Sequence, residues 1–169
     1  NSNEINIFRK EIITEVLKDL EGNILVKLED SKWNKILRTL EISFYSGWKG
    51  DSLEKQLREE YEEDLSKGFT KSGAHKFDLE INVLGDKSGN ILSRGEQKLL
   101  ILLVFLSFGE FFSKIENKNL IYLIDDLSSE LDQNNLNLAM QFLKIAKGQK
   151  VITSVKKIEN ESINQLIDL

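Results

Sequence analysis

Apolar residues recur along this chain with two different periods. From about Glu4 to Leu20 every third or fourth residue is apolar, which predicts a helix with one buried face. The stretches Leu40–Phe44 and Phe77–Val83 alternate apolar with polar residues, which is typical of half-buried strands. Between them, leucines and a tyrosine at helical spacing predict a helix that Asp51 caps and Gly68 ends.

The second half of the chain predicts alternating helices and strands. A loop over 85–90 precedes a helix from about Glu96 to Ile115, and a later helix spans about Gln133 to Lys147. Strands are predicted at Leu120–Ile124 and Val151–Ser154. The first of these is apolar throughout, so we expect it to be buried on both faces of a parallel sheet. This order of elements predicts an α/β fold.

Two segments carry weaker signals. Ile24–Val26 fits a strand, whereas the residues from Trp33 to Leu40 contain one or two turns of helical spacing, and both interpretations stay open. The C-terminal tail favours a short helix. No internal repeat or low-complexity tract is visible in the sequence.

Composition indicates a globular protein. The 169 residues are 40% hydrophobic and 30% charged, which suits one domain with its own core. The absence of cysteine excludes disulfides and cysteine-ligated metals. A net charge of -5 argues against strong electrostatic binding of nucleic acid by this chain alone.

No segment fits a membrane span or an export signal. The longest apolar stretch, residues 99–112, is interrupted by Ser107, Gly109 and Glu110, whereas a span needs about 18 or more apolar residues. A buried core helix explains it better. Because no signal peptide is visible, we expect a cytoplasmic protein without a membrane partner. The chain begins with Asn1 rather than Met, so we also expect it to be a piece of a longer protein.

Two adjacent carboxylates, Asp125 and Asp126, follow the apolar strand. Strands of a parallel sheet present their carboxyl ends to ligands. One carboxylate would hold Mg²⁺, which prefers oxygen ligands from one or two carboxylates together with phosphate. The other would orient or deprotonate an attacking water. Considered alone, the pair is explained about equally well by a solvated turn.

A helix start precedes the long apolar helix. Ser93-Arg94-Gly95-Glu96 has the spacing of a capping box, and a serine hydroxyl with helix amides can also bind an anion. Glu96 competes with phosphate for those amides. A charge at a helix end contributes about 0.3–1 kcal/mol, whereas micromolar nucleotide binding needs about 8 kcal/mol. This helix start can therefore complete a nucleotide site built mainly by another surface, but it cannot form one by itself.

A phosphate-binding loop of the type G-x-x-x-x-G-K-[ST] is missing from this sequence. Gly68 and Gly73 have the glycine spacing, but Ala74-His75 follow in place of Lys and Ser or Thr. His75 is the only histidine and forms a small basic cluster with Lys71 and Lys76. A catalytic base, a phosphate contact and a turn residue are all open for it, and a structural role is favoured about two to one for a lone histidine.

At these residues the chain resembles the C-terminal half of RecF, a family of bacterial DNA replication and repair ATPases of the ABC/SMC type. The resemblance runs in order from about residue 40 to 155 and rests on five segments. Leu92–Lys98 resembles the signature motif, Leu120–Asp126 the Walker B strand and Ser129–Asp132 the D-loop. Phe44–Trp48 resembles a segment before a charged helix, and Gly73–Lys76 resembles a Gly-Pro-His-basic motif in which Ala74 replaces proline.

The resemblance implies a partial ABC-type ATPase domain, the signature and Walker B half, with a helical subdomain. Residues 1–70 would form a mainly helical, lobe II-like region with a strand near 40–45. Residues 71–169 would form the C-terminal part of the ATPase domain, carrying the signature, Walker B and D-loop motifs. The Walker A half is absent.

It also implies a role for each site residue. Asp125 would serve Mg²⁺ in the same subunit, and Asp126, the candidate catalytic residue, would position water. Thr153 and Ser154 stand where related ATPases carry a switch histidine. The signature and D-loop residues would contact, in trans, the ATP of a second subunit or lie at the dimer seam: Ser93, Gly95, Gln97 and Asp132.

For the intact protein the resemblance implies ATP and Mg²⁺ as cofactors and a homodimer that forms when ATP binds. It further implies DNA binding at gaps and single-strand/double-strand junctions, work with RecR and RecO, help in loading recombinase, and a place in recombination and the SOS response. The fragment alone would neither bind nor hydrolyse ATP. Two alternatives stay open: half of another SMC-like or phage-defence ABC ATPase, and a non-enzymatic interaction domain.

Overall fold

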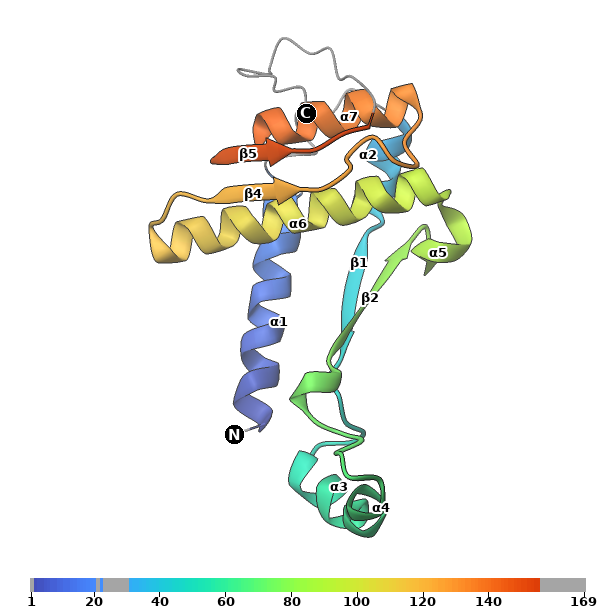
Figure 1. The fold of residues 1–169 in the computed structure, drawn as a ribbon, viewed down its shortest axis with the longest axis vertical. Helices are drawn as coiled ribbons and strands as arrows, with labels where there is room; N and C mark the ends of the chain where they lie inside the picture. Colours follow the sequence, from blue (N-terminus) through green and yellow to red (C-terminus); the bar gives the residue numbers. More distant parts are fainter. Residues whose placement is uncertain (1, 21, 23–30, 156–169) are drawn as a thin grey trace.

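The computed structural model describes residues 2–20, 22 and 31–155. Helix α6 crosses the molecule beside strands β4 and β5 and helix α7 (Figure 1). Helix α1 and the ribbon of β1 and β2 extend from this layer in the same direction, and the ribbon ends at α3 and α4. The strand considered at 24–26 and the short helix expected in the C-terminal tail lie outside the described residues.

The helices of the main layer follow the predicted apolar spacing. Helix α1 spans Ser2–Asp19, α6 spans Arg94–Glu116 and α7 spans Gln133–Ile145, which confirms the three helices predicted there. Helix α2, Ser31–Arg38, resolves the segment before Leu40 as helical. These four helices supply most of the buried apolar residues, so they form the core.

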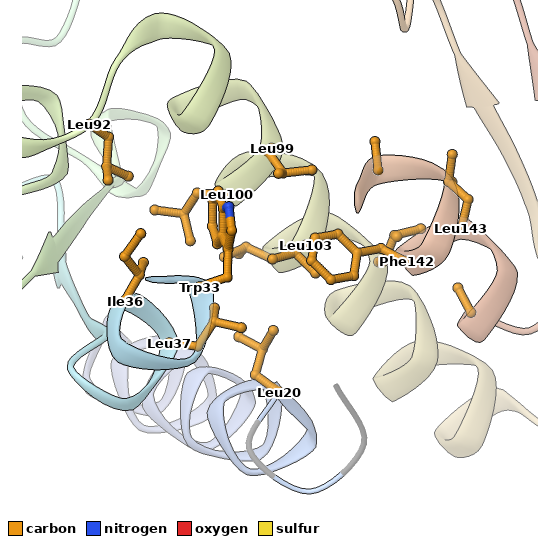
Figure 2. Packing of buried hydrophobic residues seen from close by; sticks show 14 of the residues in the cluster. Leu20, Trp33, Ile36, Leu37, Leu92, Leu99, Leu100, Leu103, Phe142 and Leu143 are labelled. Carbon is orange, nitrogen blue, oxygen red and sulfur yellow. The ribbon is translucent and has the colours of Figure 1, made fainter. Parts of the chain in front are cut away.

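The core is shown in Figure 2, where side chains from α2, α6 and α7 point toward one another and Leu20, directly after α1, joins them. Leu99 and Leu103 of α6 have no exposed surface. Trp33 of α2 meets Phe142 of α7 edge to face, with ring centroids 6.5 Å apart. Helix α6 therefore serves as the central element, and its first residues are held in place by the same packing.

Two strands form a parallel pair beside α6. Strand β4, Ile121–Ile124, pairs with β5, Gln149–Ile152, in the register Ile121 to Gln149. Tyr122 is buried against Gly109 of α6, where an added Cβ would lie 2.3 Å from the tyrosine oxygen. This glycine is what allows the helix to approach the strand so closely.

The expectation that β4 is buried on both faces is wrong for the described part of the chain. Ile121 and Leu123 are 63% and 73% exposed, and Val151 of β5 is 48% exposed. Helix α6 covers the face that carries Tyr122, and no described element covers the other face. An apolar run predicts burial, but it does not say which part of a protein supplies the cover.

The antiparallel ribbon joins the main layer to a small helical tip. Strand β1, Glu41–Tyr45, pairs with β2, Asp78–Val83, and so links the regions on either side of the division expected near residue 70. Beyond β2, the loop expected at 85–90 contains a short strand β3, Asp86–Lys87, and a single helical turn α5, Ser88–Ile91. The expectation of an irregular loop there is therefore wrong.

The tip contains two helices where one was predicted. Helices α3, Leu53–Glu59, and α4, Tyr61–Lys67, meet at Glu60, whose φ of -91° and ψ of -1° lie at the edge of the helical region. Ser52, rather than Asp51, caps α3, because its hydroxyl accepts a hydrogen bond from the Lys55 amide. The end at Gly68, in the left-handed conformation, is as predicted.

The tip and α1 are tied together by Arg9. Its guanidinium donates to the carbonyl oxygens of Ser46 (2.9 Å) and Ala74 (3.0 Å) and lies 4.3 Å from the ring centre of Phe77. The 3₁₀ turn η3, Ala74–Lys76, is thereby held beside the segment that follows β1. No helix in the described part of the chain combines the length and apolar character needed to cross a bilayer.

Candidate functional site

The first carboxylate of the predicted pair stands at the carboxyl end of β4. Asp125 directly follows Ile124 and is exposed. Its Oδ1 accepts a hydrogen bond from the hydroxyl of Thr153, at 2.5 Å, and Thr153 directly follows β5. Asp125 is therefore accessible at the sheet edge where parallel strands present ligand-binding residues.

The second carboxylate sits on an unusual backbone. Asp126 has a φ of 45°, in the left-handed region that few non-glycine residues adopt. Its amide donates to the Thr153 hydroxyl at 2.8 Å, and its carbonyl accepts from Nζ of Lys98 at 2.6 Å. Backbone conformations of this kind persist where the surroundings hold them in place.

The side-chain oxygen Oδ1 of Asp126 indicates whether a divalent cation and its water would fit at this site. Oδ1 is buried and has no hydrogen-bond partner among the described residues. A buried polar atom in that condition is unfavourable unless a water, ion or ligand satisfies it. Asp125 and Asp126 thus fit a divalent cation and its water. Among the described residues, no three or more His, Cys, Asp or Glu side chains are placed to hold one metal ion, so a cation here would take further ligands from phosphate and water.

The predicted capping box is present at the start of α6. The hydroxyl of Ser93 accepts from the Glu96 amide (3.4 Å), and the Ser93 amide donates to Oε2 of Glu96 (2.9 Å). Glu96 also forms an ion pair with Lys32 of α2. Burial acts to raise the pKa of the Glu96 carboxyl, but the hydrogen bonds from Lys32 and Ser93 outweigh it and lower that pKa. The carboxylate therefore stays charged while it caps the helix.

Ser93 remains accessible although its hydroxyl serves the cap, and Arg94 beside it is exposed as well. Gly95 is buried, and an added Cβ there would lie 2.7 Å from the carbonyl oxygen of Glu130. Gln97 donates from Nε2 to the Leu92 carbonyl at 2.8 Å. The serine thus faces outward, while the glycine lets α6 touch the loop that follows β4.

Asp132 has a structural role that the D-loop resemblance does not mention. Its side chain caps α7 by accepting from the Asn135 amide at 2.8 Å, and the residue is exposed. Two residues earlier, Glu130 has a φ of 63°. The loop over 126–132 therefore carries two left-handed residues between a strand end and a helix cap.

Lys98 brings the two predicted halves of the site together. Its ammonium donates to the carbonyl oxygens of Asp126 (2.6 Å) and Ser129 (3.0 Å). Helix α6, which Ser93 caps, is thereby bonded to residues 125–129 after β4, called the corner below. Sequence reasoning did not single out Lys98. The position of Lys98 near the N-terminus of a helix could have indicated a specific hydrogen-bond partner. A cation there opposes the helix dipole, and such a partner offsets the unfavourable electrostatic energy.

His75 belongs to the turn η3, which precedes β2, and that end of the β1–β2 ribbon points away from α6 (Figure 1). It is exposed, with one ring nitrogen 3.3 Å from the Thr70 carbonyl oxygen. The turn around it is tightly built: the Gly73 amide donates to the Gly47 carbonyl at 2.8 Å, and an added Cβ at Gly47 would lie 2.0 Å from the Gly73 oxygen. This geometry favours a turn role for His75.

The chain is similar to several curated proteins named DNA replication and repair protein RecF. That of Proteus mirabilis is 33% identical over 153 residues, which cover 90% of this chain and 40% of the relative. That of Photorhabdus laumondii is 32% identical over 168 residues, 99% of this chain and 44% of the relative. That of Aliivibrio salmonicida is 37% identical over 117 residues, 69% of this chain and 33% of the relative. No family model matches the chain.

Solved structures give the same likeness at the level of the fold. The recombination mediator protein RecF with ATP, described in the RecFOR pathway, aligns with a TM-score of 0.57 at 20% identity and covers 94% of this chain and 43% of that one. RecF with ATPrS aligns with a TM-score of 0.59, covering 92% and 42%. This likeness confirms the expected α/β fold of part of an ABC-type ATPase domain.

The chain spans less than half the length of the curated relatives described above. Within them, the likeness to RecF covers both the signature-like helix start and the carboxylate pair after β4, since the Photorhabdus alignment extends over 99% of the chain. The chain is thus 32–37% identical to RecF proteins over 69–99% of its own length, and these findings support a C-terminal portion of RecF.

Proposed function

We propose that this chain is the signature, Walker B and D-loop part of a RecF-type DNA repair ATPase. The observation that carries the proposal is a single corner at which Lys98 bonds the Ser93 helix start to the loop that carries the carboxylates. The curated relatives are DNA replication and repair proteins, and the fold matches RecF with ATP. ATP and Mg²⁺ are the cofactors proposed for the full-length protein.

The exposure and geometry of the site residues support a separate role for each of them. Asp125, accessible at the strand end, holds Mg²⁺ in its own subunit, and the unpaired oxygen of Asp126 orients the attacking water. When bound, ATP would supply the phosphoryl group, and Mg²⁺ would supply the positive charge that the carboxylate and the phosphates balance. Ser93, with Gly95 and Gln97 behind it, faces the ATP of a second subunit, and Asp132 lies at the seam between subunits.

Sharing the site between subunits has a physical reason. The described residues offer the triphosphate a helix start and two carboxylates, and the helix start contributes only about 0.3–1 kcal/mol to binding an anion. Most of the roughly 8 kcal/mol behind micromolar affinity must come from another surface. In the proposed dimer that surface is the Walker A half of one subunit, and the helix start of the second subunit completes the site when ATP brings the two together.

The wider role is proposed from the family. A full-length RecF-type protein would bind DNA at gaps and junctions, work with RecR and RecO in the cytoplasm, and help load recombinase during recombination and the SOS response. The similarity to RecF proteins over most of the chain favours this role over the half of another SMC-like ATPase. It equally favours a part of an ATPase over a stand-alone interaction domain.

We predict that this 169-residue chain does not bind ATP saturably. A fluorescent ATP analogue, titrated with Mg²⁺ into the chain up to about 100 μM, should give only a linear, non-competable signal, because the helix start is too weak an anion site. The full-length protein, titrated in parallel, is the positive control. Micromolar binding to the chain that unlabelled ATP displaces would contradict the proposed division of the site.

A further inference from the structure

Both backbone polar groups of Asp126 are held by side chains from other elements. The Thr153 hydroxyl, beyond β5, accepts from the Asp126 amide at 2.8 Å. The Lys98 ammonium, on α6, donates to the Asp126 carbonyl at 2.6 Å. A carboxylate that must aim at a reacting water gains from such a fixed backbone.

Thr153 is itself fixed opposite this corner. Its amide donates to the Ile124 carbonyl at 2.9 Å, and its carbonyl accepts from the Leu127 amide at 3.0 Å. The hydroxyl between them donates to Oδ1 of Asp125 at 2.5 Å while it accepts from Asp126. One hydroxyl therefore sets the orientation of the first carboxylate and the backbone of the second.

Lys98, on α6, also holds the backbone of the loop that contains Asp126. Besides the Asp126 carbonyl, its ammonium bonds the Ser129 carbonyl at 3.0 Å. One turn earlier on α6, Gly95 packs against the Glu130 carbonyl so closely that a methyl group would not fit. The loop over 126–130, which contains left-handed residues at both ends, thus rests on the first two turns of α6.

We propose that Lys98 and Thr153 are positioning residues that hold Asp126 in its left-handed conformation and so aim its carboxylate. This inference rests on the proposed function, because it assigns the two residues a task in the ATPase site described above. Through Lys98, the helix start that reaches a second subunit's nucleotide is joined to the carboxylate that acts on the subunit's own nucleotide. ATP hydrolysis in one site would then depend on how the helix start is placed against the nucleotide in the other site.

The test uses the full-length protein with Thr153→Val and Lys98→Met, which remove the hydroxyl and the ammonium with little change in side-chain volume. Each change should lower kcat for ATP about three- to tenfold, the range that one hydrogen bond is worth, and change KM less than about twofold. Thr153→Ser, which keeps the hydroxyl, should retain wild-type kcat. Lys144→Met, at an exposed lysine of α7, is the control for loss of a charge.

Two further readouts separate positioning from a general loss of structure. In an Asp126→Asn background, Thr153→Val should lower the residual turnover by a smaller factor than in the wild type, because only the part of its effect that acts through Asp125 remains. In amide hydrogen exchange, Thr153→Val should speed exchange at Asp126 but not at Leu127, whose amide donates to the Thr153 backbone. The exchange measurement does not depend on activity.

The outcomes distinguish the inference from the function on which it rests. If the full-length protein does not hydrolyse ATP, or Asp126→Asn hydrolyses it normally, the proposed function fails. If those two proteins behave as expected but Thr153→Val keeps full kcat, or lowers it by the same factor in the Asp126→Asn background, the inference is overturned. Thr153 is exposed, so its variant keeps the test valid even if Lys98→Met does not fold.

Discussion

Asp126→Asn in the full-length protein should lower ATP turnover to a small residual rate while leaving ATP binding intact. Asparagine has the same size and tolerates the left-handed conformation that Asp126 adopts, so the backbone corner should persist. The change removes the negative charge and basicity that orient the water, and losses of such groups cost about a hundredfold or more in kcat. Steady-state hydrolysis and equilibrium ATP binding, measured on the same protein, check both halves of this prediction.

Asp51→Asn is the matched control, since Asp51 is an exposed aspartate two residues before α3, and α3 lies at the end of the ribbon away from α6 (Figure 1). It should hydrolyse ATP at the wild-type rate. Turnover by Asp126→Asn within a few-fold of wild type would remove Asp126 from the role of orienting water. Loss of ATP binding together with turnover would instead assign Asp126 to nucleotide affinity.

Ser93→Arg in the full-length protein should prevent formation of the proposed ATP-dependent dimer. Ser93 is exposed at the start of α6, where a long, charged side chain would stand between the subunits. The change also removes the cap, which costs about 1 kcal/mol of stability. Light scattering coupled to size exclusion, with and without ATP and Mg²⁺, measures the effect as a loss of the dimer peak.

A second variant separates the docking role from the capping role. Aspartate is as good an N-cap as serine, so Ser93→Asp should fold with wild-type stability yet repel a facing triphosphate and also fail to dimerise. Ser93→Thr should keep both the cap and the dimer. ATP-dependent dimers of Ser93→Arg and Ser93→Asp at wild-type concentrations would show that this helix start does not face a second nucleotide.

Local sequence signals predicted the elements that carry the site. A serine followed three residues later by a glutamate marked the start of α6, and the capping box is present because both partners lie within one helical turn. The apolar run before Asp125 marked β4 and its end. Short-range chemistry of this kind depends on neighbouring residues, so it can be inferred without knowing the rest of the fold.

Features that depend on distant residues could not be inferred in this way. Lys98 finds its carbonyl partners 28 and 31 positions away, and Thr153 stands 27 positions from the amide that it accepts from. Both contacts involve the backbone of Asp126, which is left-handed, and neither could be inferred from the residues beside it. The open face of β4 likewise reflects which elements lie beside it, a property of the whole assembly.

The break at Glu60 shows a subtler limit. Neither glycine nor proline interrupts the leucine spacing there, so the pattern predicted one helix. The structure shifts Glu60 to the edge of the helical region while Gln56 donates to its side chain at 2.9 Å. Tertiary contacts at the tip, including the bond from Gln56 to Ser72, override a continuous local preference.

Mixing two inactive proteins tests the shared site most directly. In a dimer of one Ser93→Arg subunit and one Asp126→Asn subunit, one ATP meets an intact Asp126 and an intact Ser93, whereas the other meets neither. Ser93→Arg subunits should not pair with one another, but in a mixed dimer the one intact site can still hold the two subunits together, so the mixture should regain turnover that neither protein shows alone. A mixture as inactive as its two components would contradict a site divided between subunits.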